Sequence, residues 1–88
     1  MFMIYGVSDC PYCLKAQALC MEEGVDYAWV LMDWSSTYRD YIKEKFDWIT
    51  YPIVTKLDYD NGREELIGGY HELSGYLTDL FDKGENVV

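Results

Sequence analysis

Short runs rich in β-forming residues alternate with helical patterns, and this alternation is the feature that most constrains the fold. The first three runs predict a strand, a helix and a second strand, and a right-handed crossover would make these two strands parallel. Asp60-Asn61-Gly62 predicts a tight hairpin between two later strands, because Asn-Gly supplies the positive φ angles of such a turn. The predicted elements are strand 2–6, helix 11–23, strand 25–32, a helix that follows capping candidates at 33–37 and runs to about 46, strand 51–59, strand 63–68 and helix 71–81.

Each predicted helix presents one apolar face, and residues 82–88 read as a loose tail. The faces comprise Cys13, Ala16, Leu19 and Cys20 in the first helix, Tyr38, Tyr41, Ile42 and Phe46 in the second, and Leu73, Leu77, Leu80 and Phe81 in the third. Such faces pack against a sheet. We therefore predict an α/β fold of a single domain over residues 1–88, in which a four-stranded mixed sheet is flanked by three helices in the order β-α-β-α-β-β-α.

The composition excludes several classes of function. The chain has 88 residues, and 16 acidic against 7 basic side chains give a formal net charge of -9. Such a charge repels phosphate backbones and anionic membranes, so we expect no nucleic-acid or membrane partner. The start "MFMIYG" lacks the basic segment of a signal peptide, and no apolar run approaches the ~20 residues of a membrane span. We predict a cytoplasmic protein, in which paired cysteines are more often catalytic or metal-binding than structural.

Cys10 and Cys13 lie three residues apart at the start of the first predicted helix. If Pro11 is the first helical residue, Cys10 is the N-cap, where free N–H groups and the helix dipole favour a thiolate. Cys10 is then the candidate nucleophile, and Cys13 is the candidate resolving thiol. Zinc sites use the same spacing, but a further ligand at Cys20 would lie about 10 Å along the helix from Cys13. We therefore expect a redox couple, no metal, and a buried apolar role for Cys20.

Three segments together resemble the dithiol glutaredoxins. Cys10-Pro11-Tyr12-Cys13 is similar to the active-site tetrapeptide of that family, Thr50-Tyr51-Pro52 to its Thr-Val-Pro segment, and Gly68-Gly69-Tyr70-His71-Glu72-Leu73 to its Gly-Gly-x-x-(Asp/Glu)-Leu segment. The segments occur in the family's order, and the resemblance spans about residues 2–81. It implies a thioredoxin-like fold and a glutathione-dependent thiol-disulfide oxidoreductase.

The resemblance also implies how glutathione would bind as a co-substrate. A cis peptide before Pro52 would turn the backbone of Tyr51 toward the cysteines, where it can pair with an extended peptide. The N–H groups of Tyr70 and His71, at a helix N-terminus, would hold the γ-glutamyl carboxylate. Arg39 stands where the family places an Arg or Gln on the glycyl carboxylate, although a solvated helix charge is an equally good interpretation. The implied glutathione-binding residues are Tyr12, Arg39, Thr50, Tyr51, Pro52, Gly69, Tyr70 and His71.

Three residues depart from the family pattern. Val7 stands where many members have Lys or Arg, so we expect one glycyl-carboxylate contact to be missing. Tyr51 replaces the usual Val and is expected to narrow the groove or stack on a ligand. His71 replaces an Asp, Ser or Thr, which would make that contact sensitive to pH near neutrality unless the side chain is only exposed at the helix start.

Three alternatives stay open at this point. A redoxin reduced by thioredoxin reductase would share the fold, but such proteins usually carry Ser-Gly-Phe where this chain has Gly68-Gly69-Tyr70. Two chains and two glutathiones could instead hold an iron–sulfur cluster through Cys10, although Pro11 is not the usual residue for that role. An interaction domain with an unused dithiol is the third alternative. By resemblance, the expected partners are glutathione and disulfide-containing proteins, with ribonucleotide reductase a candidate among them, and we expect a monomer.

Overall fold

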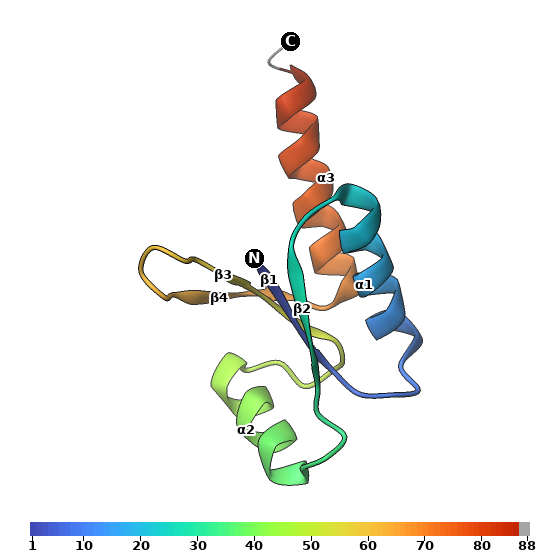
Figure 1. Cartoon of the computed structure of the whole chain (residues 1–88), viewed down its shortest axis with the longest axis vertical. Helices are drawn as coiled ribbons and strands as arrows, with labels where there is room; N and C mark the ends of the chain where they lie inside the picture. The colour runs from blue at the N-terminus through green and yellow to red at the C-terminus, as the bar shows by residue number, and fades with distance from the viewer. Residues whose placement is uncertain (87–88) are drawn as a thin grey trace.

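The structure is a computed structural model that describes the backbone of residues 1–86 and the side chains of residues 1–80. Its elements follow the predicted order (Figure 1). They are β1 (Phe2–Gly6), α1 (Pro11–Glu23), β2 (Tyr27–Leu31), α2 (Ser36–Phe46), β3 (Ile53–Leu57), β4 (Glu64–Gly68) and α3 (Tyr70–Asn86).

The four strands form one mixed sheet in the order β2-β1-β3-β4. β1 pairs with β2 in parallel, with Phe2 opposite Tyr27, as the crossover through α1 requires. β3 pairs antiparallel with both β1 and β4, and the register between β3 and β4 shifts at Val54/Thr55. The mixed four-stranded sheet is the one that the pattern predicts, and its thioredoxin-like arrangement is the one that the resemblance implies.

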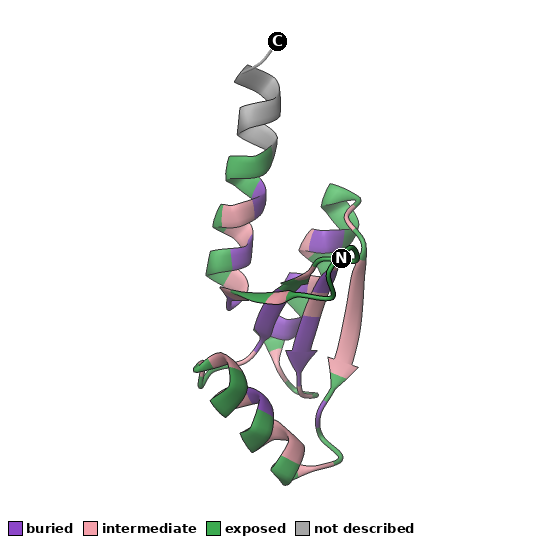
Figure 2. Ribbon diagram, turned by 90° about the vertical axis from the view of Figure 1, so that its left-hand side faces the viewer, coloured by how far each residue is buried: buried purple, intermediate pink, exposed green. Residues whose placement is uncertain are grey.

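Helices cover both faces of the sheet, and the core lies in two layers. Figure 1 shows α1 and α3 together on one side and α2 on the other. The buried residues on the α1 and α3 side are Phe2, Ile4, Ala16, Cys20, Val54, Leu73 and Leu77. Those on the α2 side are Tyr5, Met32, Ile42 and Ile53. Figure 2 shows the buried positions concentrated in the central strands and on the helix faces turned toward them.

The structure corrects three predictions at the helices. Tyr41 and Leu80, predicted on the buried faces, are 56% and 48% exposed, while Ile42, Leu73 and Leu77 are buried as predicted. Residues 82–86, predicted as a loose tail, continue α3. The predicted burial of Phe81 lies outside the described side chains.

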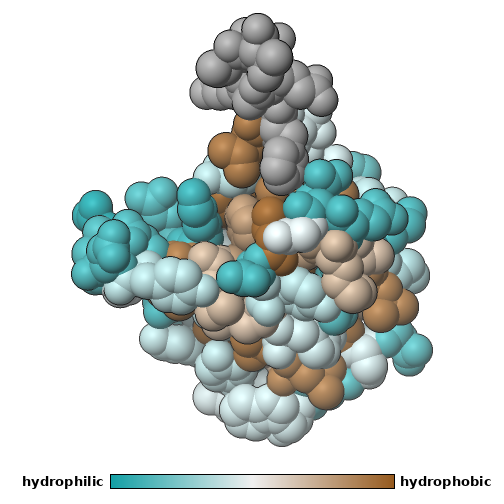
Figure 3. Space-filling model, turned by 45° about the horizontal axis from the view of Figure 1, so that its top comes forward, coloured by the Kyte–Doolittle hydropathy of each residue, from teal (hydrophilic) through white to brown (hydrophobic). Residues whose placement is uncertain are grey.

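The surface is hydrophilic where the chain turns between β3 and β4. Figure 3 shows these polar side chains gathered over the hairpin, at the left of the view. The exposed residues there include Asp58, Asp60, Asn61 and Arg63. Over the described residues, no helix combines the length and the apolar character that crossing a bilayer would need.

Candidate active site

The chain reaches the first cysteine through a short turn at the end of β1. β1 ends at Gly6, and Asp9 adopts a left-handed conformation with φ 55°. An Asp tolerates this conformation better than most residues. Cys10 is then the N-cap of α1 in extended conformation, and Pro11 begins the helix. The predicted capping position of Cys10 is therefore confirmed.

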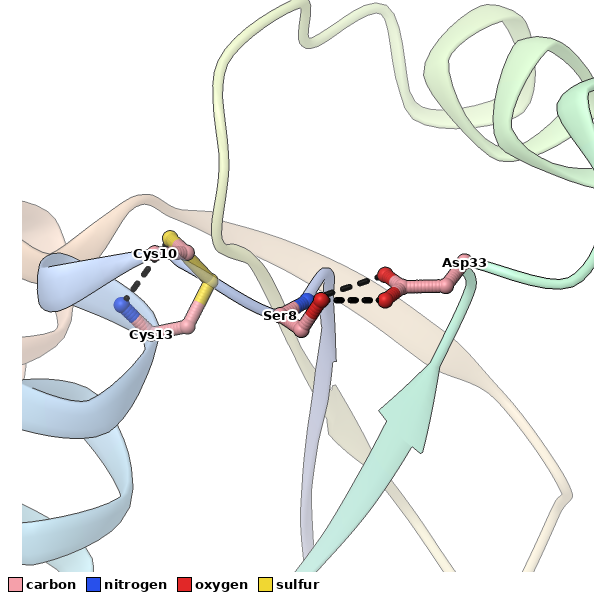
Figure 4. The surroundings of a disulfide bond; sticks show 4 residues. All are labelled: Ser8, Cys10, Cys13 and Asp33. Carbon is pink, nitrogen blue, oxygen red and sulfur yellow. Dashed lines mark hydrogen bonds between the residues drawn. A yellow bond between two sulfur atoms is a disulfide. The ribbon is translucent and has the colours of Figure 1, made fainter.

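Cys10 and Cys13 are joined by a disulfide bond, with their Cα atoms 5.2 Å apart (Figure 4). The backbone N–H of Cys13 donates to Cys10 Sγ at 3.2 Å, so the sulfur lies at the free N–H groups of the helix start. Cys13 is completely buried, whereas Cys10 is partly exposed. The geometry thus makes Cys10 the sulfur that an outside thiol or disulfide can reach, and it keeps Cys13 behind it.

Gly6 and Trp29 enclose the buried sulfur. A β-carbon placed on Gly6 would lie 2.6 Å from Cys13 Sγ and 2.8 Å from the Trp29 ring. Only a glycine allows so close an approach. The sequence analysis did not assign a role to either residue, and only the position of Gly6 at the end of an apolar run hinted at one.

A cavity of about 300 Å³ lies where three distant segments meet. Tyr12 comes from the cysteine motif, Thr50 and Tyr51 from the segment before β3, and the others from the start of α3. The lining residues are Tyr12, Thr50, Tyr51, Gly69, Tyr70, His71 and Glu72. The structure therefore brings six of the eight predicted glutathione-binding residues together around one cavity.

The cavity is lined largely by aromatic rings. The Tyr12 ring centroid lies 6.0 Å from that of Tyr70 and 5.6 Å from that of His71. Lys15 Nζ lies 5.0 Å from the Tyr12 ring centroid, and Lys43 Nζ lies 4.9 Å from that of Tyr51. Such positions suit cation–π contacts. The two ammonium groups therefore lie against aromatic rings of the lining, while Glu72 contributes a carboxylate to it.

The peptide bond between Tyr51 and Pro52 is cis, as the resemblance implies. Pro52 is buried and does not line the cavity. Tyr51 precedes Ile53, the first paired residue of β3, so its backbone lies outside the sheet ladder. The hydroxyl oxygen of Tyr51 is buried and pairs with no group in the described part of the chain.

Arg39 is not among the residues that line the cavity. Its Nη1 donates to the carbonyl oxygen of Met32 at 2.8 Å and to that of Asp33 at 3.0 Å. These bonds give the side chain more than the role of a solvated helix charge, and the predicted contact with a carboxylate ligand stays a prediction. The guanidinium joins α2 to the chain that follows β2.

Glu72 was quoted in the motif but given no role by the sequence analysis. Its Oε1 accepts a hydrogen bond from the N–H of Gly69 at 2.8 Å, which is half of a capping box. The carboxylate therefore stands at the start of α3, beside the Tyr70 and His71 N–H groups that were predicted to bind an anion. The spacing of three between Gly69 and Glu72 was the signal that could have found this contact.

The remaining cysteine lies in the core. Cys20 is completely buried, and burial raises the pKa of its thiol. Over the described residues, no three side chains of His, Cys, Asp or Glu gather into a group that could hold a metal ion.

Known proteins share both the sequence pattern and the fold. Residues 2–56, more than half of the chain, match the family model described as Glutaredoxin. A buckwheat glutaredoxin, solved as a glutathione complex, superposes with a TM-score of 0.70 at 20% identity, over 89% of this chain and 68% of its own. A Brucella melitensis glutaredoxin superposes with a TM-score of 0.63 at 21% identity, over 96% of this chain and 80% of its own. No curated protein sequence matches the chain.

A thioredoxin fold with a capping cysteine and a buried partner one turn later defines a dithiol oxidoreductase. The chain belongs to the glutaredoxin family. It is accordingly a thiol-disulfide oxidoreductase of the glutaredoxin type, with Cys10 and Cys13 as its redox pair.

Proposed function

We propose that this glutaredoxin uses glutathione as its electron donor and reduces protein disulfides and glutathione mixed disulfides. The observation that carries the proposal is the cavity formed by Tyr12, Thr50, Tyr51 and the start of α3. Its volume of about 300 Å³ falls at the lower end of the range for small-molecule sites. The buckwheat glutaredoxin that shares the fold was solved with glutathione bound, which supports the same ligand here.

The proposed reaction begins with the Cys10 thiolate. It attacks one sulfur of a substrate disulfide, forms a mixed disulfide and releases the other sulfur as a thiolate. With a protein disulfide, Cys13 then attacks Cys10 Sγ, releases the substrate thiolate and closes the Cys10–Cys13 disulfide. Two glutathione molecules return that disulfide to the dithiol and leave as oxidised glutathione.

With a glutathione mixed disulfide, Cys13 is not needed. Cys10 takes the glutathionyl group and frees the protein thiol, and a second glutathione attacks the adduct on Cys10. The exposure of Cys10 and the burial of Cys13 suit these two routes, because the incoming thiol must reach Cys10 alone.

The cavity also suits the two ends of glutathione. The N–H groups of Tyr70 and His71 at the start of α3 are proposed to bind the γ-glutamyl carboxylate. At the other end, Arg39, whose Nη1 also donates to backbone carbonyls, and Lys43, over the Tyr51 ring, are the proposed sources of positive charge for the glycyl carboxylate. On family resemblance, the proposed protein substrates include ribonucleotide reductase. We propose that the protein is cytoplasmic, because a working dithiol needs a reducing compartment. We also propose that it is a monomer.

The test is to reduce the oxidised protein with either of two donor systems. Glutathione with glutathione reductase and NADPH should convert the Cys10–Cys13 disulfide to the dithiol, followed as NADPH consumption. Thioredoxin reductase with NADPH forms the parallel arm and should give no turnover. Turnover with thioredoxin reductase alone would keep the fold and the cysteine roles but reject the glutathione site.

A further inference from the structure

Both oxygens of one carboxylate, in the loop after β2, accept hydrogen bonds from the turn that carries Cys10. The backbone N–H of Ser8 donates to Asp33 Oδ1 at 2.9 Å, and the Ser8 hydroxyl donates to Asp33 Oδ2 (Figure 4). The figure shows the Ser8 side chain pointing toward Asp33 and away from the disulfide. The two residues are 25 positions apart in the chain, so the contact joins two loops that only the fold brings together.

The backbone that carries this carboxylate is also held in place by hydrogen bonds. Arg39 Nη1 donates to the carbonyl oxygens of Met32 and Asp33, which ties this backbone to α2. The pKa of Asp33 lies below its ordinary value, because Ser8 donates two hydrogen bonds to the carboxylate and Arg39 adds a nearby positive charge. At neutral pH the group is therefore an ionised acceptor, and hydrogen bonds to ionised acceptors are the stronger kind.

Ser8 lies in the turn that leads the chain from β1 into the active site. Only Asp9, with its left-handed φ of 55°, separates Ser8 from Cys10. Within the described residues, the contacts to Asp33 are the hydrogen bonds that residues 7–9 make. The direction in which Cys10 leaves the turn, and hence its sulfur's place at the Cys13 N–H, depends on where Ser8 is held.

We propose that Asp33, anchored by Arg39, is a positioning residue for the reaction, which holds Ser8 so that Cys10 Sγ stays at the N-terminus of α1. In this proposal Arg39 acts on the site through Asp33. The inference rests on Cys10 being the nucleophile of the proposed function. It does not depend on glutathione, so the two proposals can fail separately.

The direction in which the reactivity of Cys10 changes when Asp33 is removed separates this positioning role from a simple effect of charge. If the Asp33 charge merely repelled a thiolate, its removal would make Cys10 more reactive, because a nearby like charge disfavours the ionised form. If Asp33 positions the sulfur, its removal makes Cys10 less reactive, because the thiolate loses the helix N-terminus. The other charged groups around the turn, Asp9, Lys15 and Arg39, are unchanged in both cases.

The experiment measures alkylation of Cys10 by iodoacetamide as a function of pH, in reduced protein that carries Cys13→Ser. This substitution leaves Cys20 as the other thiol, and Cys20 is buried. For Asp33→Ala we expect the midpoint of the alkylation rate against pH to move to higher pH. The alkylation rate at mildly acidic pH should fall about fivefold, which is the factor that corresponds to the free energy of a lost helix cap. Ser8→Ala should act in the same direction with a smaller effect, because the Ser8 N–H still reaches Asp33. The double variant should react no more slowly than Asp33→Ala alone.

Two matched variants serve as controls. Asp9→Asn removes a charge beside Cys10 and keeps the turn, since Asn also tolerates a positive φ, so its rate should stay equal or rise. Ser35→Ala removes a comparable bond, from the N–H of Tyr38 to Ser35 Oγ, at the start of α2, and should leave the profile unchanged. Circular dichroism checks that each variant is folded.

Two results would overturn the proposal. An increased rate in Asp33→Ala, like that of Asp9→Asn, would assign Asp33 an effect of charge only. A profile equal to that of Ser35→Ala would show that the contact does not act on Cys10. Should Asp33→Ala not fold, the profile of Ser8→Ala decides by the same two criteria.

Discussion

The two cysteines stand one helical turn apart but in different surroundings. Cys10 is reachable at the helix start, while Cys13 is closed in by Gly6 and Trp29. Their different surroundings could be predicted from the sequence, because Pro11 fixes where the helix begins and helical spacing places Cys13 on the inner face. The enclosure by Trp29 could not, because it depends on β2 lying beside β1.

The tight packing at Gly6 gives a first prediction. Gly6→Ala should lower the free energy of unfolding of the oxidised protein by about 1–3 kcal/mol, because the added methyl group overpacks the space between Cys13 and Trp29. Urea unfolding followed by circular dichroism measures the change. Gly75→Ala is the matched control: its site in α3 is open, so it should raise stability by about 0.5–1 kcal/mol. Equal stability of Gly6→Ala and the parent protein would contradict the packing described.

Tyr5 and Tyr51 give a second prediction, because only one of them has a partner for its hydroxyl within the described residues. Tyr5 Oη donates to Glu64 Oε2 at 2.5 Å, whereas the hydroxyl of Tyr51 pairs with nothing in the described part of the chain. Tyr5→Phe should cost about 2 kcal/mol of stability, since it removes a bond to a charged group. Tyr51→Phe should be neutral or stabilising. The reverse order in chemical denaturation would show that the assigned partners are wrong.

At the scale of elements, Glu64 ties three strands together. Its Oε2 accepts from Tyr5 on β1 and from Thr55 on β3, the latter at 2.6 Å. Burial, with the nearby Glu64 carboxylate as the second cause, raises the pKa of Tyr5 above its ordinary value. The bonds to Glu64 lie on the α2 side of the sheet and hold β4 beside β3.

This network predicts a loss of stability in alkali. In the unfolded chain a tyrosine loses its proton near pH 10, while Tyr5 in the folded protein keeps it. The contribution of Tyr5 to the free energy of unfolding is therefore complete below pH 10 and is lost as the pH rises further. One such group lowers the unfolding free energy by at most about 1.4 kcal/mol per pH unit. Cys20, whose pKa is also raised, adds a decline that begins near pH 8.5.

Denaturant melts at increasing pH measure this decline. Tyr5→Phe should reduce the decline in unfolding free energy above pH 10, and Cys20→Ala should reduce the decline that begins near pH 8.5. Unfolding free energies that rise with pH in this range, or a decline that Tyr5→Phe leaves unchanged, would contradict the assignment.

The order and type of all seven elements could be predicted, but several ends could not. Strand 25–32 shortens to Tyr27–Leu31, and the predicted strand 51–59 shortens to Ile53–Leu57, after Pro52, which has no N–H to donate to a ladder. Helix α3 passes Gly84, since a single glycine costs a helix only about 1 kcal/mol and no proline stops it. Local sequence thus sets the kind of element more firmly than its limits.

At the scale of the whole molecule, the net charge of -9 opposes the folded state. Repulsion between acidic side chains is screened by salt, with a Debye length of about 10 Å at 0.1 M. Thermal unfolding at increasing NaCl should therefore show Tm rising by about 5 °C, the shift that about 1 kcal/mol gives a domain of this size. A Tm that falls with salt would mean that favourable charge pairs outweigh the repulsion.

The candidate site shows where sequence reasoning stops. The three motif segments could be placed together because family resemblance supplies their arrangement, and six of the residues named from it do line one cavity. The hydrogen bonds of Arg39 to the backbone of Met32 and Asp33, and the contact between Ser8 and Asp33, could not be predicted. They join loops after β1 and β2 to α2, and nothing in the local pattern of any of these segments records the contact.

The central claim is that Cys10 is the attacking sulfur and that glutathione is the donor. The most direct measurement compares the parent protein, Cys10→Ser and Cys13→Ser in reducing a glutathionylated peptide with glutathione, glutathione reductase and NADPH. The account predicts that Cys13→Ser keeps turnover on this substrate, while Cys10→Ser has none. Equal loss of activity in both variants, or no turnover of the parent protein with glutathione, would contradict it.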